Sequence, residues 1–286
     1  MTYRLRIVGA GLAPVESIPL FHYAVGGRAL RLVVASSEGS SPKCEGYDIC
    51  DTLDASLSTG VPVPVERLSW RASMWGVDVV LLEGLEPQTS VDPRALKETL
   101  RRPLGLRTLG LYEAQYSFYD FIVFDLLFAN ESLPSRSARN LEEALESRAW
   151  VEAVAHIPDA RSLDLALEVA GLMTARRETP LHVIVRDPGG GAGIEDFYRR
   201  LSSMLDFVYI HAGPYSRLDT LCPSCSSPVV TRWDGLLESL APTAPRCPSC
   251  GKAIPLRATR NSVVGVKGLE ARRRRGVSVW FNAVEL

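Results

Sequence analysis

Short apolar runs alternate with amphipathic segments along most of the chain. Six runs are rich in β-branched or aromatic residues and have the length of strands: Leu30–Ala35, Val77–Leu82, Phe121–Phe124, Val151–Val154, Leu181–Val185 and Phe207–Ile210. Four segments between them carry apolar residues at helical spacing: Pro93–Arg101, Ala138–Ser147, Ser162–Ala175 and Ile194–Leu205. This alternation predicts an α/β fold with a parallel sheet, either doubly wound or closed toward a barrel. Functional groups are then expected on the loops that follow the strands.

Two glycine-rich segments come after predicted strands. Val8–Pro14 imitates a dinucleotide-binding fingerprint, but it lacks the third small residue, and Pro14 and Pro19 disfavour the helix that should follow. We therefore interpret this segment as a plain turn. Pro188–Gly193 precedes a predicted helix, where successive N–H groups could cradle an anion. It lacks the Lys-Ser/Thr ending of a phosphate-binding loop, so a flexible loop is the favoured reading.

Charge is balanced overall but unevenly distributed. The 286 residues, 46% of them hydrophobic and 23% charged, can form one large domain or one large and one small domain. The net charge of −1 gives no general attraction to nucleic acid or membranes. From Lys252 onward, however, the net charge is +6, including the run Arg272–Arg275, against −7 for the rest. Nucleic-acid binding through this basic tail stays open, beside the simpler reading of a solvated charged face.

Four of the six cysteines form two identical tetrapeptides, Cys222-Pro-Ser-Cys225 and Cys247-Pro-Ser-Cys250. Each CxxC turn places two thiolates on one side of a knuckle, and the two knuckles together predict a four-thiolate metal site of the zinc-ribbon type. A closed sulfur site without histidine favours structural Zn²⁺, although thiolates also hold iron and iron–sulfur clusters.

A pair of disulfides is the alternative for these cysteines. The segment that starts at Met1 does not resemble a secretory signal, and no apolar run approaches the ~20 residues of a membrane span. We therefore expect a cytoplasmic protein without membrane contact. In that reducing compartment, paired CxxC motifs are usually metal ligands.

Several segments match one enzyme family in the same order along the chain. Pro19–Tyr23, Gly27–Leu30, Thr179–Val183 and Phe207–Tyr209 are followed by the two CxxC pairs. From Pro19 to about Pro255 the chain resembles radical S-adenosylmethionine (SAM) enzymes of the branch related to pyruvate formate-lyase activating enzyme, in particular the radical SAM protein of the AmmeMemoRadiSam system. The resemblance implies a partial (β/α)6 TIM-like barrel that carries a C-terminal zinc ribbon.

The family's cluster-binding motif is incomplete in this sequence. Members of the family bind a [4Fe–4S] cluster with three cysteines spaced CxxxCxxC after the first barrel strand, and Ser37, Ser41 and Cys44 stand at these places here. Serine is a poor ligand for iron, and one cysteine cannot hold a cubane cluster. Cys50 could add a second sulfur, which is still one short of three. A [4Fe–4S] cluster is therefore not expected.

The family's SAM-binding segment is also altered. Where the family has Gly-Gly-Glu-Pro, this chain has Gly84-Leu85-Glu86-Pro87, so a bulky leucine stands where the backbone must approach the ligand. Gly84, Glu86 and Pro87 are at most a degenerate remnant of that site. The strand end Asp125–Leu127 likewise lacks the family's lysine. The sequence thus predicts a SAM-free barrel over residues 1–215, a zinc ribbon over 216–256 and a basic extension over 257–286.

The resemblance and its losses together predict a pseudoenzyme with no catalytic residues. We expect a binding or regulatory protein with a structural Zn²⁺, a protein partner, and room for a small molecule in the barrel mouth. Two alternatives stay open: an active radical SAM-type enzyme with an unusual cluster or cofactor, and a nucleic-acid-binding protein that uses the ribbon and the basic tail. The four histidines have no assigned function in this reading; they are His22, His156, His182 and His211.

Overall fold

A ten-stranded sheet is the largest element of the protein. The computed structural model describes residues 3–36, 50–128, 132–259 and 279–282. The strands follow the order β10-β9-β8-β7-β6-β5-β3-β1-β15, with β4 also paired to β1. They are β1 (Arg4–Pro14), β3 (Arg28–Val34), β4 (Val61–Pro64), β5 (Val79–Glu83), β6 (Leu104–Thr108), β7 (Phe121–Leu127), β8 (Trp150–Asp159), β9 (Leu181–Asp187), β10 (Val208–His211) and β15 (Val279–Asn282). From β3 to β10 the strands are parallel neighbours in chain order, while β1 pairs antiparallel with β3, β4 and β15.

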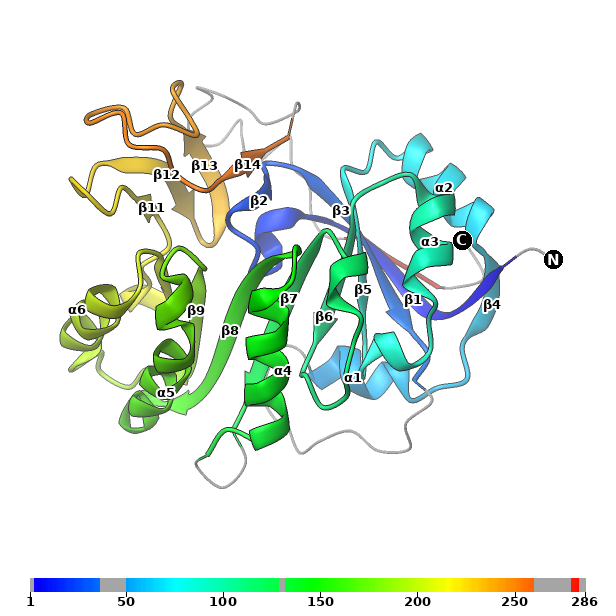
Figure 1. Ribbon diagram of the computed structural model, residues 1–286, viewed down its shortest axis with the longest axis horizontal. Helices are drawn as coiled ribbons and strands as arrows, with labels where there is room; N and C mark the ends of the chain where they lie inside the picture. The colour runs from blue at the N-terminus through cyan, green and yellow to red at the C-terminus, as the bar shows by residue number, and fades with distance from the viewer. Residues whose placement is uncertain (1–2, 37–49, 129–131, 260–278, 283–286) are drawn as a thin grey trace.

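Helices α2 to α6 cover one face of this sheet, while α1 lies at the end of the strands, where its Leu53 packs with Leu85 and Leu109 (Figure 1). The helices are α1 (Cys50–Ser56), α2 (Val65–Met74), α3 (Pro93–Leu100), α4 (Ser135–Glu146), α5 (Asp164–Met173) and α6 (Ile194–Met204). Right-handed crossovers between neighbouring parallel strands place successive helices on the same side. Alternate strand residues, such as Leu30, Leu32 and Leu106, pack against the helices in the main core. The residues between them point to the opposite face, which we call the inner face.

The predicted α/β class is confirmed. All six predicted strands and all four predicted helices are present, with ends that differ by a few residues. The N-cap of α3 is Asp92, whose carboxylate accepts hydrogen bonds from the N–H groups of Arg94 and Ala95. The sheet does not close on itself within the described residues, so the barrel stays part of the proposal below. None of the described helices combines the length and apolar character needed to cross a bilayer.

The interpretation of Val8–Pro14 as a turn is wrong. These residues lie inside β1, where Ala10 and Leu12 pair with Leu32 and Leu30 of β3. On its other edge the same stretch pairs with β15. Hydrogen bonding along both edges outweighs the weak strand preference of Gly9 and Gly11. A dinucleotide-binding loop at this position is excluded, because there is no loop.

The four-cysteine segment forms a small sheet of its own beside the large one (Figure 1). Its strands are β11 (Thr220–Leu221), β12 (Pro228–Trp233) and β13 (Leu236–Leu240). Asp234 and Gly235 join β12 to β13 with φ values of 51° and 75°. Such a left-handed pair, with Asp-Gly in the turn, matches the right-handed twist of a two-residue hairpin. We call residues 220–256 the ribbon.

The ribbon and the large sheet share a hydrophobic core. Phe21, which follows β1, and Tyr209 of β10 pack in one cluster with Val230 and Leu237 of the ribbon and with the buried Cys222. A further contact joins β14 (Arg257–Ala258) to β2 (Tyr23–Val25) as a two-stranded parallel pair. This packing shows that the ribbon and the large sheet are in direct contact. The predicted domain boundaries stay a prediction.

Candidate metal centre and inner face of the sheet

The two CxxC knuckles meet at the tip of the ribbon. The thiol sulfurs of Cys222, Cys225, Cys247 and Cys250 all lie within 4.8 Å of one another. The Sγ atoms of Cys222 and Cys250 are 3.6 Å apart, and those of Cys225 and Cys247 are 3.5 Å apart. None of the four forms a disulfide.

Matching backbone hydrogen bonds shape the two knuckles. Cys222 N–H donates to the carbonyl of Ser227 at 2.9 Å, and Cys247 N–H donates to the carbonyl of Lys252 at 2.8 Å. Ser226 and Gly251 close the turns with φ values of 57° and 74°. The knuckles are therefore two copies of one local structure that face each other across the thiols.

The donor set and its geometry fit a tetrahedral metal ion. Zn–S bonds of about 2.3 Å give a tetrahedron with edges of about 3.8 Å, close to the sulfur separations observed here. Hydrogen bonds from Ser227 lower the pKa of Cys225, whereas the neighbouring thiols raise the pKa of Cys250, so a bound cation would be needed to hold all four as thiolates. Four sulfurs would complete the coordination shell, so the ion would stabilise the ribbon and leave no open position for chemistry.

The inner face carries two groups of paired charges. Arg31 of β3 forms a bidentate pair with the buried Glu83 of β5, with N–O distances of 2.9 and 2.8 Å. Arg107 of β6 forms a second bidentate pair with Asp125 of β7, and His156 of β8 binds the same carboxylate at 2.7 Å. Burial alone would raise the pKa of Asp125, but Arg107 and His156 hold it at about 2. The Asp125 carboxylate thus stays ionised, and both of its oxygens are hydrogen-bonded to Arg107 or His156.

Glu152 of β8 is the centre of a further buried network, beside the two groups of paired charges. Its side chain accepts hydrogen bonds from the backbone N–H groups of Phe21 and His22, from the indole of Trp150 and from His182 of β9. All four donors lie at 2.7–3.0 Å. Glu152 therefore ties the segment after β1 to the middle of the sheet.

A chain of hydrogen bonds continues from this point to the ribbon. His22 Nε2 lies 2.6 Å from the hydroxyl of Tyr209, which lies 2.7 Å from Thr220 Oγ1. Arg232 of β12 donates to Thr220 Oγ1 and to the carbonyl of Phe21, and its guanidinium lies 3.9 Å from the centre of the Phe21 ring. The ribbon is consequently connected to the inner face of the sheet through buried polar contacts as well as through the shared core.

Burial keeps three histidines of these networks neutral. It lowers the pKa of His22 to about 4 and lowers the pKa of His182 and His211 well below the usual value. His182 Nδ1 lies 3.0 Å from His211 Nε2, so one of the two rings donates to the other. Sequence reasoning found no partner for His211 and none for His156, and the structure supplies both.

We predict that the protein loses stability as the pH falls from about 6.5 toward 4. In this range the unfolded chain protonates histidines that the folded chain holds neutral, and for His22 alone the shift from 6.5 to about 4 corresponds to about 3 kcal/mol. Urea unfolding at pH 7.5, 6 and 5 measures how the free energy of unfolding changes with pH.

The variant His22→Gln is the control for this pH dependence of the free energy of unfolding. Burial also raises the pKa of Glu152, which opposes the loss, so the comparison of the two proteins measures His22 together with its effect on the neighbouring Glu152. The variant should lose less stability between pH 7.5 and 5 than the native protein. Parallel pH profiles for the two would contradict the prediction.

The segment predicted as a degenerate SAM site lies after β5. Glu86 has a φ of 49° and is completely buried. Its carboxylate accepts hydrogen bonds from the Thr108 hydroxyl, from the N–H groups of Leu109 and Tyr112 and from Gln88. The Leu85 side chain packs with Leu53 and Leu109. Glu86 thus holds the loop after β6 in place, although the resemblance assigns this side chain to SAM binding.

The predicted cluster loop and the basic run lie outside the described residues. This holds for Ser37, Ser41 and Cys44, and for Arg272–Arg275. Cys50 is the first residue of α1. The predictions made for these positions therefore stay predictions.

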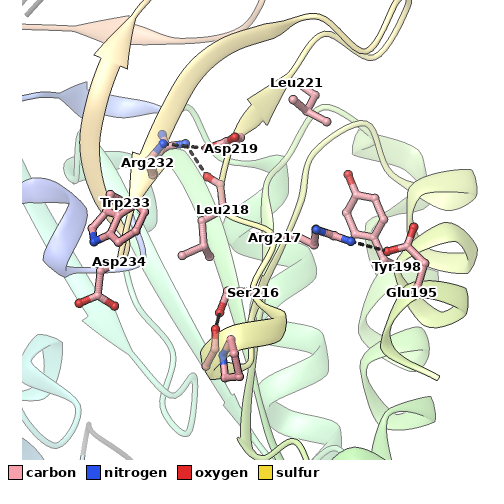
Figure 2. A pocket seen from close by; sticks show the side chains of 12 residues that line it. Glu195, Tyr198, Ser216, Arg217, Leu218, Asp219, Leu221, Arg232, Trp233 and Asp234 are labelled. Atoms are coloured by element: carbon pink, nitrogen blue, oxygen red, sulfur yellow. Dashed lines mark hydrogen bonds and ion pairs between the residues drawn. The ribbon is translucent and has the colours of Figure 1, made fainter. Parts of the chain in front are cut away.

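A cleft of about 830 Å³ lies between the ribbon and α6 (Figure 2). Trp233 and Asp234 of the β12–β13 hairpin line one side, and Glu195 and Arg217 line the other. It is separate from the residues of the inner face. The small-molecule site expected in the barrel mouth thus remains a prediction, and the structure adds a cavity that the sequence did not reveal.

Together, the fold and the site define an open, mostly parallel α/β protein with a four-cysteine ribbon that could hold a metal ion. No family model and no curated protein matches the chain. Among solved structures, the crystal structure of QueE from Escherichia coli is similar, with a TM-score of 0.46 and 13% sequence identity over 73% of this chain and 94% of that chain. A similarity of this size assigns neither a reaction nor a ligand.

Proposed function

We propose that this protein is a non-catalytic relative of radical SAM enzymes, with a partial barrel, a structural Zn²⁺ in the ribbon and a role in binding a partner. The sequence supports the proposal through Ser37 and Ser41, which stand where the family has cluster-binding cysteines. A role in binding or regulation would follow, since Ser37, Ser41 and Cys44 offer only one thiolate where the family binds its [4Fe–4S] cluster with three.

The observation that carries the proposal is the environment of Glu86. Both oxygens of its carboxylate accept hydrogen bonds from the chain's own groups. A ligand that used Glu86 would have to displace buried donors, and each unpaired buried donor costs about 1–3 kcal/mol. Burial raises the pKa of this carboxyl, which further disfavours a free charge. In the segment that resembles the SAM site, Glu86 therefore stabilises the fold instead of binding a ligand.

The pairing on the inner face agrees with a scaffold role. Glu83, Asp125 and Glu152 are completely buried, and each accepts at least two hydrogen bonds from the chain. A general base or a metal ligand needs a carboxylate with an open side. These three carboxylates are better suited to fixing the positions of strands.

Metal analysis after anaerobic reconstitution with iron, sulfide and SAM tests the proposal. We expect one zinc and no iron per chain, no visible absorption of an iron–sulfur centre, and no conversion of SAM to deoxyadenosine. Cleavage of SAM, or about four irons per chain in addition to the zinc of the ribbon, would overturn it in favour of an active enzyme. Tight, salt-sensitive binding to mixed nucleic acid would favour the alternative of a nucleic-acid-binding protein.

A further inference from the structure

Two cysteines of the four-cysteine site are open to solvent and two are buried. Cys225 and Cys250 are exposed, whereas Cys222 and Cys247 are only 1% and 2% exposed and pack in the core that the ribbon shares with Phe21. A small oxidant in water therefore meets one sulfur of each knuckle first. The oxidation of cysteine by peroxides depends on the exposure of the sulfur, so the two positions differ in reactivity.

Each exposed sulfur lies beside a buried sulfur of the other knuckle. The two pairs, with 3.6 and 3.5 Å between their Sγ atoms, are Cys222 with Cys250 and Cys225 with Cys247. Independently of a metal, the hydroxyl of Ser227 donates to the hydroxyl of Ser249 at 2.7 Å and joins the two knuckles. A second thiol so close to an oxidised cysteine converts it to a disulfide and protects it from further oxidation.

We infer that the four-cysteine site is a peroxide-sensitive switch that gives up its zinc when two of its thiolates are oxidised. The Cys225 thiolate attacks one oxygen of hydrogen peroxide, the O–O bond breaks, hydroxide leaves, and Cys225 becomes a sulfenic acid. The Cys247 thiolate then attacks the Cys225 sulfur, forms the S–S bond and displaces a second hydroxide. Two electrons pass from the two thiolates to the peroxide. Cys250 and Cys222 react in the same way with a further molecule of peroxide.

Oxidation of one pair removes half of the metal donors. Two remaining sulfurs cannot complete a tetrahedral shell, and a neutral disulfide offers no charge to a cation. A disulfide between Cys225 and Cys247 also stabilises a small module less than a structural zinc ion does. The oxidised ribbon is therefore expected to be free of zinc and less stable than the reduced ribbon. The inference rests on the structural zinc of the proposed function and adds its regulation.

The ribbon holds one side of the segment that follows β1, so its state affects the large sheet. Arg232 donates to the carbonyl of Phe21 at 2.8 Å, and the carbonyl of Pro255 lies 2.8 Å from His22 Nδ1. The opposite side of this segment is hydrogen-bonded to β8. Oxidation of the ribbon is thus expected to loosen residues 21–25, because only one of their two supports remains.

Zinc release from the zinc-loaded full chain tests the switch. A zinc-binding dye reports the free ion during treatment with hydrogen peroxide and, in parallel, with buffer alone. We expect release to be at least about tenfold faster with peroxide. Dithiothreitol with added zinc should then restore one zinc per chain. Retention of the zinc in millimolar peroxide, or a release that reduction does not reverse, would overturn the inference.

Trapping of the sulfenic acid with dimedone tests the order of the reaction. Mass spectrometry of peptides should find the adduct on Cys225 or Cys250, and disulfides that join the two knuckles. Adducts that form first on Cys222 or Cys247 would contradict the assignment of the exposed sulfurs as the sites of attack.

The double variant Cys44→Ser, Cys50→Ser is the control for the remaining thiols. It removes the two cysteines outside the CxxC pairs and should release zinc at the native rate. A variant that keeps its zinc in peroxide would show that the oxidation begins at Cys44 or Cys50 and would overturn the inference.

Hydrogen exchange measures how far the change extends. In the oxidised, zinc-free chain, the amides of the ribbon and of residues 21–25 should exchange at least about tenfold faster than in the zinc-loaded chain. The amides of α4, on the helical face of the sheet, should keep their rates (Figure 1). Unchanged exchange at residues 21–25 would overturn the coupling between the ribbon and the sheet.

The two proposals fail in distinguishable ways. A chain that holds zinc in the ribbon and also assembles an iron–sulfur cluster loses the proposed function, whatever peroxide does to the zinc. A chain that assembles no cluster and keeps its zinc in peroxide retains the proposed function and loses only the switch.

Discussion

Replacing Cys222 or Cys247 by serine is expected to abolish metal binding and to unfold the ribbon. Both cysteines are buried in the core that the ribbon shares with Phe21 and Tyr209. Structural zinc sites contribute about 10–16 kcal/mol of apparent binding free energy to small modules. A small ribbon has little core of its own, so removal of one thiolate should cost most of its stability. Zinc content and the thermal unfolding temperature measure the effect.

Ser224→Ala is the control within the same knuckle, because Ser224 is exposed and is not a ligand. It should retain one zinc per chain and the native unfolding temperature. The effect of Cys222→Ser should extend beyond the ribbon, since loss of its packing exposes Phe21 and Tyr209. Retained zinc stoichiometry and unchanged unfolding in the cysteine variants would refute a structural metal site.

Replacing Glu152 by alanine is expected to destabilise the whole sheet by about 4 kcal/mol or to prevent folding. The substitution leaves four buried donors without their acceptor: two backbone N–H groups, one indole and one imidazole. Glu152→Gln keeps the volume but turns an NH₂ group toward donors, so it should also be strongly destabilising. Urea unfolding at pH 7.5 gives the change in the free energy of unfolding.

Glu98→Ala serves as the comparison for Glu152. Glu98 is exposed on α3, and among the described residues its one ion pair is with Arg94, at 3.4 Å. Exposed pairs of this kind contribute about 0.3–0.5 kcal/mol, so the unfolding curve should hardly move. Similar curves for the Glu152 and Glu98 variants would mean that the buried network does not hold the sheet together.

Hydrophobic periodicity predicted most of the sheet, and the failures have physical causes. β6 contains Gly105, whose place on the inner face is occupied by the ring of Phe121, so the strand lacks a continuous apolar signature. Helix α2 buries only Val65, Leu68 and Ala72 and exposes Trp70 and Met74, which obscures its amphipathic pattern. Both elements are specified by tertiary packing more than by local preference.

Spacing alone predicted the four-cysteine site, but the buried networks could not be assembled from the sequence. Glu152 and His156 interrupt an apolar strand at alternate positions, which indicates one polar face without naming a partner. Apart from Trp150, the partners of Glu152 lie 30 to 131 residues away, and only the fold brings them together. The cleft was missed for the same reason, since α6 and the hairpin meet only in three dimensions.

The hydrogen bonds that join the start of the sheet to the ribbon also bear on how the protein is made. The carbonyl of Phe21 accepts a hydrogen bond from Arg232, 211 residues further along the chain, and His22 Nδ1 donates to the carbonyl of Pro255, 233 residues away. During synthesis, the N–H groups of Phe21 and His22 can pair with Glu152 once β8 has emerged, but the Phe21 carbonyl and the His22 ring find their partners only when the ribbon has left the ribosome. We expect nascent chains that stop before the ribbon to expose Phe21 and to depend on chaperones until the second knuckle has emerged.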